Sequence, residues 1–271
     1  MKFNYLTPYY RMSDYKFNKE GYYQTYLTLN NFMKKSNTIN INNKNISATT
    51  IINKICPKRS IGCENLCFNI IRYNKKYINS SMTEFINNST KDYLNDKSLF
   101  KKNLEKDINE LIQRAGESKI PVVRLNNMSD ILWENIITDI FINNPKVQFY
   151  DYTKHNIEKR ILNLKKKSID NYHLVYSRTE NDSWERISFL LEQNIDVAVV
   201  LEPELKTNLL TQKVYKDYYL IDGDIYDNRI IDQQYKKEKL INKGILILLN
   251  VVNTNGRKDF TGFVIKDLDV L

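Results

Sequence analysis

The sequence predicts an α/β fold in which helices cover a sheet of parallel strands. Apolar runs rich in β-branched residues alternate with helical patterns at a period of about 25 residues. These runs are apolar at consecutive positions, as strands buried on both faces are. With only seven Gly and five Pro in 271 residues, no linker-like stretch interrupts the chain, so we expect one main domain.

About six strand-helix units follow one another, fewer than the eight of a closed barrel. The alternatives are a doubly wound sheet and an open, partial (βα)6-type TIM-like barrel. We favour the partial barrel because charged or thiol side chains follow each predicted strand abruptly, as if they gathered on one rim.

The N-terminal residues 1–45 are polar, rich in Tyr and Asn, and only weakly periodic. We expect them to form an irregular segment that packs on a barrel-like domain of residues 46–271. The first buried strand is predicted at Ile46–Ile52 (ISATTII), because this run is β-branched and bounded by polar residues. Helices are then predicted at Glu64–Tyr73, Met82–Leu94 and Ser98–Ala115, the last ending at Gly116.

The rest of the chain is more regular. Strands are predicted at Ile120–Leu125, Val147–Thr153, Tyr172–Ser177, Asp196–Glu202, Tyr218–Asp222, Ile245–Val252 and Gly262–Ile265. Helices are predicted at Asp130–Ile142, Asn156–Leu164 and Trp184–Gln193.

The candidate site residues follow these strands, because ligands of parallel α/β proteins bind at the carboxyl ends of the strands. We predict that Asp130, Lys154, Asp222 and Asp224 are catalytic. We predict that Arg124, Asn126, Asp151, Arg178, Glu202 and Arg229 bind substrate. The segment DGDIYDNRIID, which starts at Asp222, could hold Mg²⁺ or accept a proton; the alternative is a capped turn with an Asp227–Arg229 ion pair.

All three cysteines, Cys56, Cys63 and Cys67, lie in one window with the spacing C-x6-C-x3-C. Clustered thiolates suit a soft metal or an iron–sulfur cluster, and three ligands leave one coordination position open. The spacing differs from that of zinc ribbons and from the C-x3-C-x2-C of radical S-adenosylmethionine enzymes. The alternatives are burial of Cys63 and Cys67 on one face of a short helix, and redox or nucleophilic chemistry.

The composition is basic: 41 Lys and Arg against 32 Asp and Glu give a net charge of +9. This charge suits an anionic small molecule or a nucleic acid, although a general bias toward Asn and Lys also explains it. The sequence offers no signal-peptide pattern and no apolar run longer than Ile245–Val252, so we expect a cytoplasmic protein without a membrane partner. It also has no GxSxG motif and no Gly-rich phosphate loop, which argues against serine hydrolases and P-loop ATPases.

Several motifs occur in a fixed order: CPKRSIGCENLCF, VVRLNNMSDILW, NPKVQFYDYTK, YHLVYSRTE, VAVV, IDGDIYDNRIID and DFTGFVI. From about residue 40 to the end, this order resembles the gene-product-88-like family of bacteriophages and mobile elements. Phe68 stands where the family has Tyr, and NNMSD replaces its Gly-Asp turn while keeping Asp130. The family is similar in outline to radical S-adenosylmethionine barrels, which implies an iron–sulfur cluster, with or without S-adenosylmethionine, or zinc.

Two hypotheses of function follow. The first is a radical-S-adenosylmethionine-like iron–sulfur or metal enzyme, cytoplasmic in its host, that acts on a nucleotide or nucleic acid. The second is a non-enzymatic nucleic-acid-binding phage protein with structural cysteines or zinc, in which aromatic residues of Tyr9–Tyr26 stack on bases. The same tyrosines could instead pack the N-terminal segment on the domain.

Overall fold

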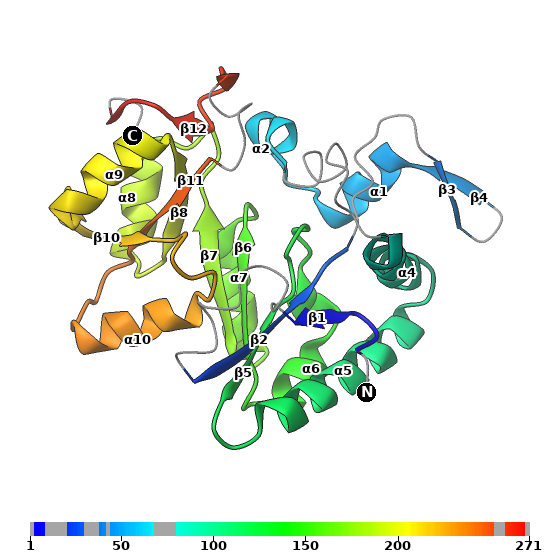
Figure 1. The fold of residues 1–271 in the computed structure, drawn as a ribbon. Helices are drawn as coiled ribbons and strands as arrows, with labels where there is room; N and C mark the ends of the chain where they lie inside the picture. The colour runs from blue at the N-terminus through cyan, green and yellow to red at the C-terminus, as the bar shows by residue number, and fades with distance from the viewer. Residues whose placement is uncertain are drawn as a thin grey trace. The chain divides into compact units, whose positions relative to one another are not determined.

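The computed structural model describes residues 3–8, 21–29, 38–41, 44–67, 80–251 and 258–268. Nine strands follow one another in a mostly parallel sheet that does not close among these residues, and a tenth strand, β12, pairs beside β8 (Figure 1). The predicted α/β class with a parallel sheet is therefore confirmed.

Contacts between residues divide the chain into two compact units. The first unit comprises residues 1–57, 68–151 and 159–173, and the second comprises residues 58–67, 152–158 and 174–271. The division expected at residue 45 stays a prediction.

The first unit contains the amino-terminal strands of the sheet. Strand β2 (Tyr22–Leu27) is parallel to β5 (Ile120–Arg124), which is parallel to β6 (Gln148–Thr153); β1 (Leu6–Pro8) is antiparallel to β2. Helix α5 (Lys97–Ala115) lies along β2 and β5 (Figure 1). It ends at Gly116, whose φ of 61° is left-handed, as predicted for a glycine stop.

The first sheet strand is not where the sequence indicated. Tyr22–Leu27 is a strand although residues 1–45 were expected to be irregular. Of the strand predicted at Ile46–Ile52, only Ile46 and Ser47 are extended, at the end of β4 (Lys44–Ser47), which pairs antiparallel with β3 (Thr38–Ile41); the prediction is wrong from Ala48 onward. That run instead begins helix α1 (Ala48–Ile55), in which Ser47 Oγ accepts the Thr50 N–H at 3.2 Å. The helix buries Ile51, Ile52 and Ile55, so its apolar residues follow a helical spacing that overrides their β propensity.

Four further helical segments belong wholly or mostly to the first unit. They are α4 (Ser80–Asn95), the 3₁₀ turn η2 (Trp133–Asn135), α6 (Thr138–Asn143) and α7 (Ile157–Lys166). The single helix predicted at Asp130–Ile142 is therefore replaced by a loop, the turn and a short helix. The buried rings of Tyr93, Phe100 and Trp133 pack against one another with centroids 5.4–5.8 Å apart.

The second unit contains β7 from Leu174 onward and the carboxyl-terminal strands, in the order β7-β8-β11-β10-β9. Strands β7 (Tyr172–Ser177), β8 (Val197–Leu201), β11 (Leu246–Asn250) and β10 (Tyr218–Asp222) are parallel, and β9 (Val214–Tyr215) is antiparallel to β10. Because β11 lies between β8 and β10, neighbours in the sheet are not always neighbours in the chain, as they would be in a simple sequential barrel.

The helices of the second unit follow its strands. Helix α8 (Trp184–Glu192) was predicted almost to the residue, whereas α9 (Pro203–Gln212) and α10 (Ile230–Glu238) were not predicted. The short helix α2 (Ile61–Asn65) replaces the start of the helix predicted at Glu64–Tyr73, of which residues 68–73 lie outside the described part.

Strand β12 (Val264–Ile265) pairs with part of one edge of β8. Strand β7 pairs with the start of β8, at Val197 and Ala198, and β12 pairs with its end, at Val200 and Leu201. Since β11 occupies the other edge of β8 along its whole length, β7 and β12 share one edge. The paired part of β7 thus ends beside Ala198, and β12 continues the same edge of β8 toward its carboxyl end (Figure 1).

Membrane-spanning segments were sought among the helices of the described residues. None of them is both long enough and apolar enough to cross a bilayer.

Candidate functional site

Helix α2 carries Cys63, and Cys67 follows it by two residues. The helix begins at Ser60, whose Oγ accepts the Cys63 N–H at 3.3 Å. Its Gly62 N–H donates to Glu180 Oε1 at 2.8 Å, just beyond the end of β7. A Cβ on Gly62 would lie 2.3 Å from Phe263 Cβ, so only glycine lets α2 approach the segment before β12 this closely.

The exits of β6 and β7 supply two predicted cations beside this helix. Lys154 Nζ donates to Ser177 Oγ at 2.5 Å and lies 5.1 Å from the centre of the Phe263 ring. Arg178 is 3% exposed, and its Nη1 donates to the Gly262 carbonyl at 2.8 Å. Burial lowers the pKa of Arg178. Arg178 thus holds the segment that enters β12, whereas Lys154 is the more accessible cation.

Glu180 was not among the predicted site residues, although it follows the same strand. Burial acts to raise the pKa of Glu180, but the Gly62 N–H, the Ser60 hydroxyl and the charge of Lys154 outweigh it and hold that pKa below its usual range. The carboxylate is therefore ionised at neutral pH and anchors the cysteine-bearing helix. The only signal in the sequence was its position three residues after a strand.

A second constellation lies at the carboxyl ends of β10 and β11. Asp222 and Asp224 both bind the ammonium of Lys206, a side chain of α9 that is 4% exposed, with Asp224 Oδ2 at 2.6 Å from Nζ. Asp224 Oδ2 also accepts the Asn250 N–H at 2.8 Å. The buried lysine thus occupies the position between the two carboxylates at which the sequence suggested Mg²⁺.

Two other predicted residues of the second unit have mainly structural contacts. Arg229 is buried, donates to the Tyr226 carbonyl and pairs with Asp232 Oδ2 at 3.1 Å; the alternative ion pair with Asp227 stays a prediction. Glu202 precedes α9, and its N–H donates to the Ile265 carbonyl at 3.1 Å.

In the first unit, Asp151 and Asn126 form the centre of a buried network. Asp151 accepts the Asn126 N–H at 2.5 Å and the Tyr172 hydroxyl at 2.6 Å. Burial raises the pKa of Asp151 to about 7, against the lowering effect of these hydrogen bonds and of Arg124 and Arg160. Asn126 Oδ1 accepts three hydrogen bonds from the loop that follows β5, from Ser129 Oγ, Ile131 N–H and Trp133 Nε1.

Asp130 lies in that loop beside a buried ion pair. Arg160 binds Glu134 with two hydrogen bonds of 2.8 and 2.6 Å, and its Nη1 lies 3.8 Å from Asp130 Oδ1. The Asp130 N–H donates to the Ile55 carbonyl at 2.7 Å, and Cys56 Sγ lies 3.5 Å from the Met128 carbonyl oxygen. Cys56 and Asp130 therefore meet in the first unit.

The predicted residues fall into two sets. The second unit holds Cys63, Cys67, Lys154, Arg178, Glu202, Asp222, Asp224 and Arg229, and the first holds Cys56, Arg124, Asn126, Asp130 and Asp151. No disulfide joins the three cysteines. Within the described ranges, no group of three or more His, Cys, Asp or Glu side chains is arranged to hold a metal ion. A site built from all three thiols stays a prediction.

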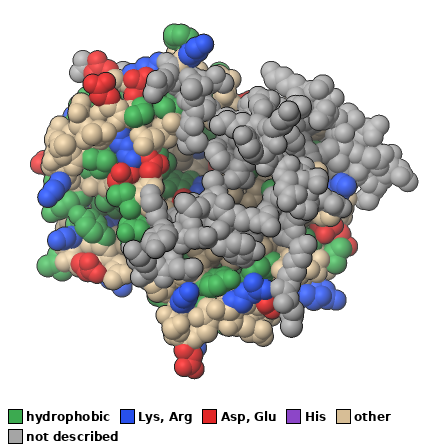
Figure 2. All heavy atoms as spheres, viewed as in Figure 1, with side chains coloured by type: hydrophobic (Ala, Val, Ile, Leu, Met, Phe, Trp, Pro, Cys, Tyr) green, Lys and Arg blue, Asp and Glu red, His purple; other side chains and the backbone are tan. Residues whose placement is uncertain are grey.

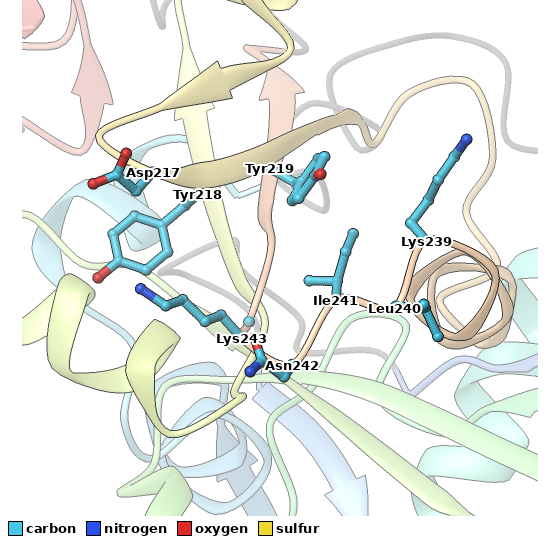
Figure 3. Close-up of a pocket in the computed structure, with 9 residues that line it drawn as sticks. Asp217, Tyr218, Tyr219, Lys239, Leu240, Ile241, Asn242 and Lys243 are labelled. Carbon is cyan, nitrogen blue, oxygen red and sulfur yellow. The ribbon is translucent and has the colours of Figure 1, made fainter.

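A pocket of about 180 Å³ lies elsewhere in the second unit (Figure 3). It is next to the start of β10 and the loop before β11, the opposite ends of these strands from Asp222 and Asp224. Lys243 extends toward Tyr218, and both donate to Glu192 Oε1, at 2.7 and 2.6 Å. No residue predicted from the sequence lines this pocket.

The nucleic-acid hypothesis relied on charge and on the aromatic residues of Tyr9–Tyr26. Residues 9–20 lie outside the described part, and Tyr22 and Tyr26 are buried in the core, so these two tyrosines pack rather than stack on a ligand at the surface. On the described part of the face in Figure 2, Lys and Arg side chains are interspersed with Asp and Glu.

Comparison with known proteins identifies the family. Searches of curated proteins and of solved structures gave no match, so the similarity in outline to radical S-adenosylmethionine barrels stays a prediction. The profile of the family described as Gene product 88 matches residues 16–264, which is most of the chain. The protein belongs to the Gene product 88 family.

Proposed function

We propose that this protein is an enzyme that binds a soft metal or an iron–sulfur cluster through cysteine thiolates and acts on an anionic substrate. The observation that carries the proposal is the hydrogen bond from Gly62 N–H to Glu180 Oε1, 2.8 Å long. It holds the helix of Cys63 at the carboxyl end of β7, the edge at which parallel α/β proteins carry their chemistry.

Thiolate sulfur atoms are the donors that thiophilic metals prefer. Cys63 and Cys67 are half-buried; Cys63 lies within α2 and Cys67 two residues after its end, so two thiolates are supplied by one short segment. The sequence-based prediction adds Cys56 as a third ligand. A bound cluster would supply electron transfer, and an iron with a free coordination position could bind S-adenosylmethionine, as the predicted resemblance to radical enzymes implies.

The side chains beside α2 have separate tasks in this proposal. Lys154, which lies between the Ser177 hydroxyl and the Phe263 ring, attracts the anionic group of the substrate. Arg178 positions the segment before β12 by donating to the Gly262 carbonyl, and Glu180 positions α2 by accepting the Gly62 N–H. Asp222 and Asp224, whose negative charge Lys206 partly neutralises, are the proposed proton acceptors of the second unit.

Metal analysis of the anaerobically purified chain tests the proposal. We expect the wild-type protein to contain iron with acid-labile sulfide, or zinc. The C63S and C67S variants should each lose most or all of this metal. The C56S variant tests the third ligand. The matched control is N65A, an exposed position on the same helix, which should keep its metal. A wild-type protein that holds neither iron nor zinc after reconstitution would sink the proposal.

The nucleic-acid-binding alternative gives a different result in the same variants. It predicts salt-dependent affinity for DNA or RNA that the C63S and C67S substitutions leave unchanged. The enzyme proposal predicts that these substitutions abolish any conversion of substrate.

A further inference from the structure

A row of polar side chains crosses one face of the sheet in the first unit. Tyr26 of β2, Arg124 of β5 and Tyr150 of β6 are side by side in the register of the parallel strands, so their side chains share a face. Gln24 lies two residues before Tyr26 on the same face. The other face of β6 carries Phe149, which packs edge-on against Phe141 of α6 with ring centroids 4.7 Å apart. The polar row is thus on the face away from this helix contact.

Polar residues at such positions require an explanation, because strands of parallel sheets are normally apolar on both faces. Gln24 is 5% exposed, and its Nε2 donates to the hydroxyls of both Tyr26 and Tyr150, at 2.7 and 2.6 Å. The two phenols therefore hold the amide group in place. The arrangement is preorganised in the way that ligand sites are.

The other end of this amide is not satisfied. Gln24 Oε1 is buried and has no hydrogen-bond partner among the described residues. An unpaired buried acceptor lowers the stability of the folded protein by about 1–3 kcal/mol. We therefore expect Gln24 Oε1 to accept a hydrogen bond from a ligand. The cationic group nearest in the register is Arg124, the last residue of β5 and thus at the carboxyl end of the strand.

The separation of the two groups limits the ligand. Gln24 and Arg124 are on neighbouring strands and two residues apart along them, which puts their Cα atoms roughly 8 Å apart. A single inorganic phosphate therefore reaches Arg124 without satisfying Gln24. A ligand that contacts both residues needs an anionic group at one end, for Arg124, and an N–H donor at the other, for Gln24 Oε1.

We propose that Gln24 and Arg124 form a nucleotide-binding site in the first unit. The guanidinium of Arg124 binds the phosphate, since its planar fork matches phosphate oxygens. Gln24 Oε1 accepts a hydrogen bond from an exocyclic amino group of the base. Tyr26 and Tyr150 are positioning residues, because they act by orienting the amide. The site needs no metal, so the inference stands or falls separately from the function proposed above.

Calorimetric titration with AMP, IMP and inorganic phosphate tests this site. IMP lacks the exocyclic amino donor of AMP: a carbonyl acceptor stands in its place, and the neighbouring N1 carries a proton that the adenine ring lacks. We expect the wild-type chain to bind AMP about three- to tenfold more tightly than IMP, the ratio for one net hydrogen bond, and to bind phosphate more weakly than either.

Two variants assign the contacts. Q24M keeps the size of the side chain and should bind AMP and IMP equally, whereas R124Q should weaken the binding of both nucleotides about tenfold or more. K119Q removes a cation from the opposite end of β5 and is the matched control, with unchanged affinities. Near-ultraviolet circular dichroism checks that each variant folds; if Q24M does not, the wild-type comparison of AMP with IMP and the R124Q titration decide.

Wild-type protein that binds AMP no better than IMP overturns the assignment to Gln24. Loss of affinity in K119Q equal to that in R124Q overturns the assignment to Arg124. Absence of any AMP binding at millimolar concentration overturns the site as a whole.

Discussion

Replacing Gly62 by alanine tests how tightly the cysteine-bearing helix is seated. The added Cβ would lie 2.3 Å from Phe263 Cβ and 2.5 Å from Thr261 Oγ1, whereas ordinary contacts begin at 3.4 Å. Because Phe263 Cβ is attached directly to the backbone before β12, no side-chain rotation relieves the clash. Helix α2 must shift by about 1 Å, which strains or breaks the hydrogen bond from the residue 62 N–H to Glu180.

The expected cost follows from these contacts. Overpacking costs about 1–3 kcal/mol, and a hydrogen bond to a charged acceptor contributes about 1.5–3 kcal/mol. The better helix propensity of alanine returns about 1 kcal/mol. We expect a net loss of about 2–4 kcal/mol in the free energy of unfolding of the part that includes α2.

Two measurements check this prediction. Urea denaturation gives the loss of stability, and the rate at which a thiol reagent modifies Cys63 and Cys67 in a C56S background shows whether α2 has detached. We expect faster modification in the alanine variant. N65A, on the exposed side of α2, should match the parent in both assays. An alanine variant at position 62 with unchanged stability and unchanged thiol rates would refute the close packing described here.

Two further predictions concern buried charges. Since burial raises the pKa of Asp151 from 3.8 to about 7, the folded state keeps a proton that the unfolded chain loses; this stabilisation is complete below pH about 4 and is lost as the pH rises through 7. The decrease in melting temperature between pH 5 and 7.5 should thus be smaller in D151N than in wild type, and an equal decrease would contradict the raised pKa. Lys236 and Asp196 form an ion pair at 2.8 Å with side chains 7% and 0% exposed, so K236M should lower the free energy of unfolding by about 3–5 kcal/mol in urea titrations. K243M removes the cation of an exposed ion pair and should leave the free energy of unfolding unchanged. If K236M and K243M lowered it equally, burial of the ion pair would not be what determines the loss of stability.

The pattern of apolar residues was sufficient to predict those strands and helices whose conformation is determined by their local sequence. Strands Tyr172–Ser177 and Tyr218–Asp222 were predicted to the residue, because short apolar runs between turn residues have few other conformations. The helix Lys97–Ala115 was recognised from its spacing and its terminal glycine. The pattern failed at Tyr22–Leu27, where glutamine and tyrosines on one face disguise a buried strand, and at Ile46–Ile52, where a serine cap turns a β-branched run into a helix.

The sequence by itself determined the α/β class, the family and the placement of charged residues at strand exits. Only the tertiary structure decided which of those charges are already paired. Lys206 of helix α9 reaches Asp222 and Asp224 at the carboxyl end of β10, and Arg178 is buried against the backbone that leads into β12. Such contacts join residues far apart in the chain, and neither hydrophobic periodicity nor residue spacing specifies them. They depend on strand order, in which β11 and β12 both pair with β8, and that order is set by packing of the whole sheet rather than by any local stretch.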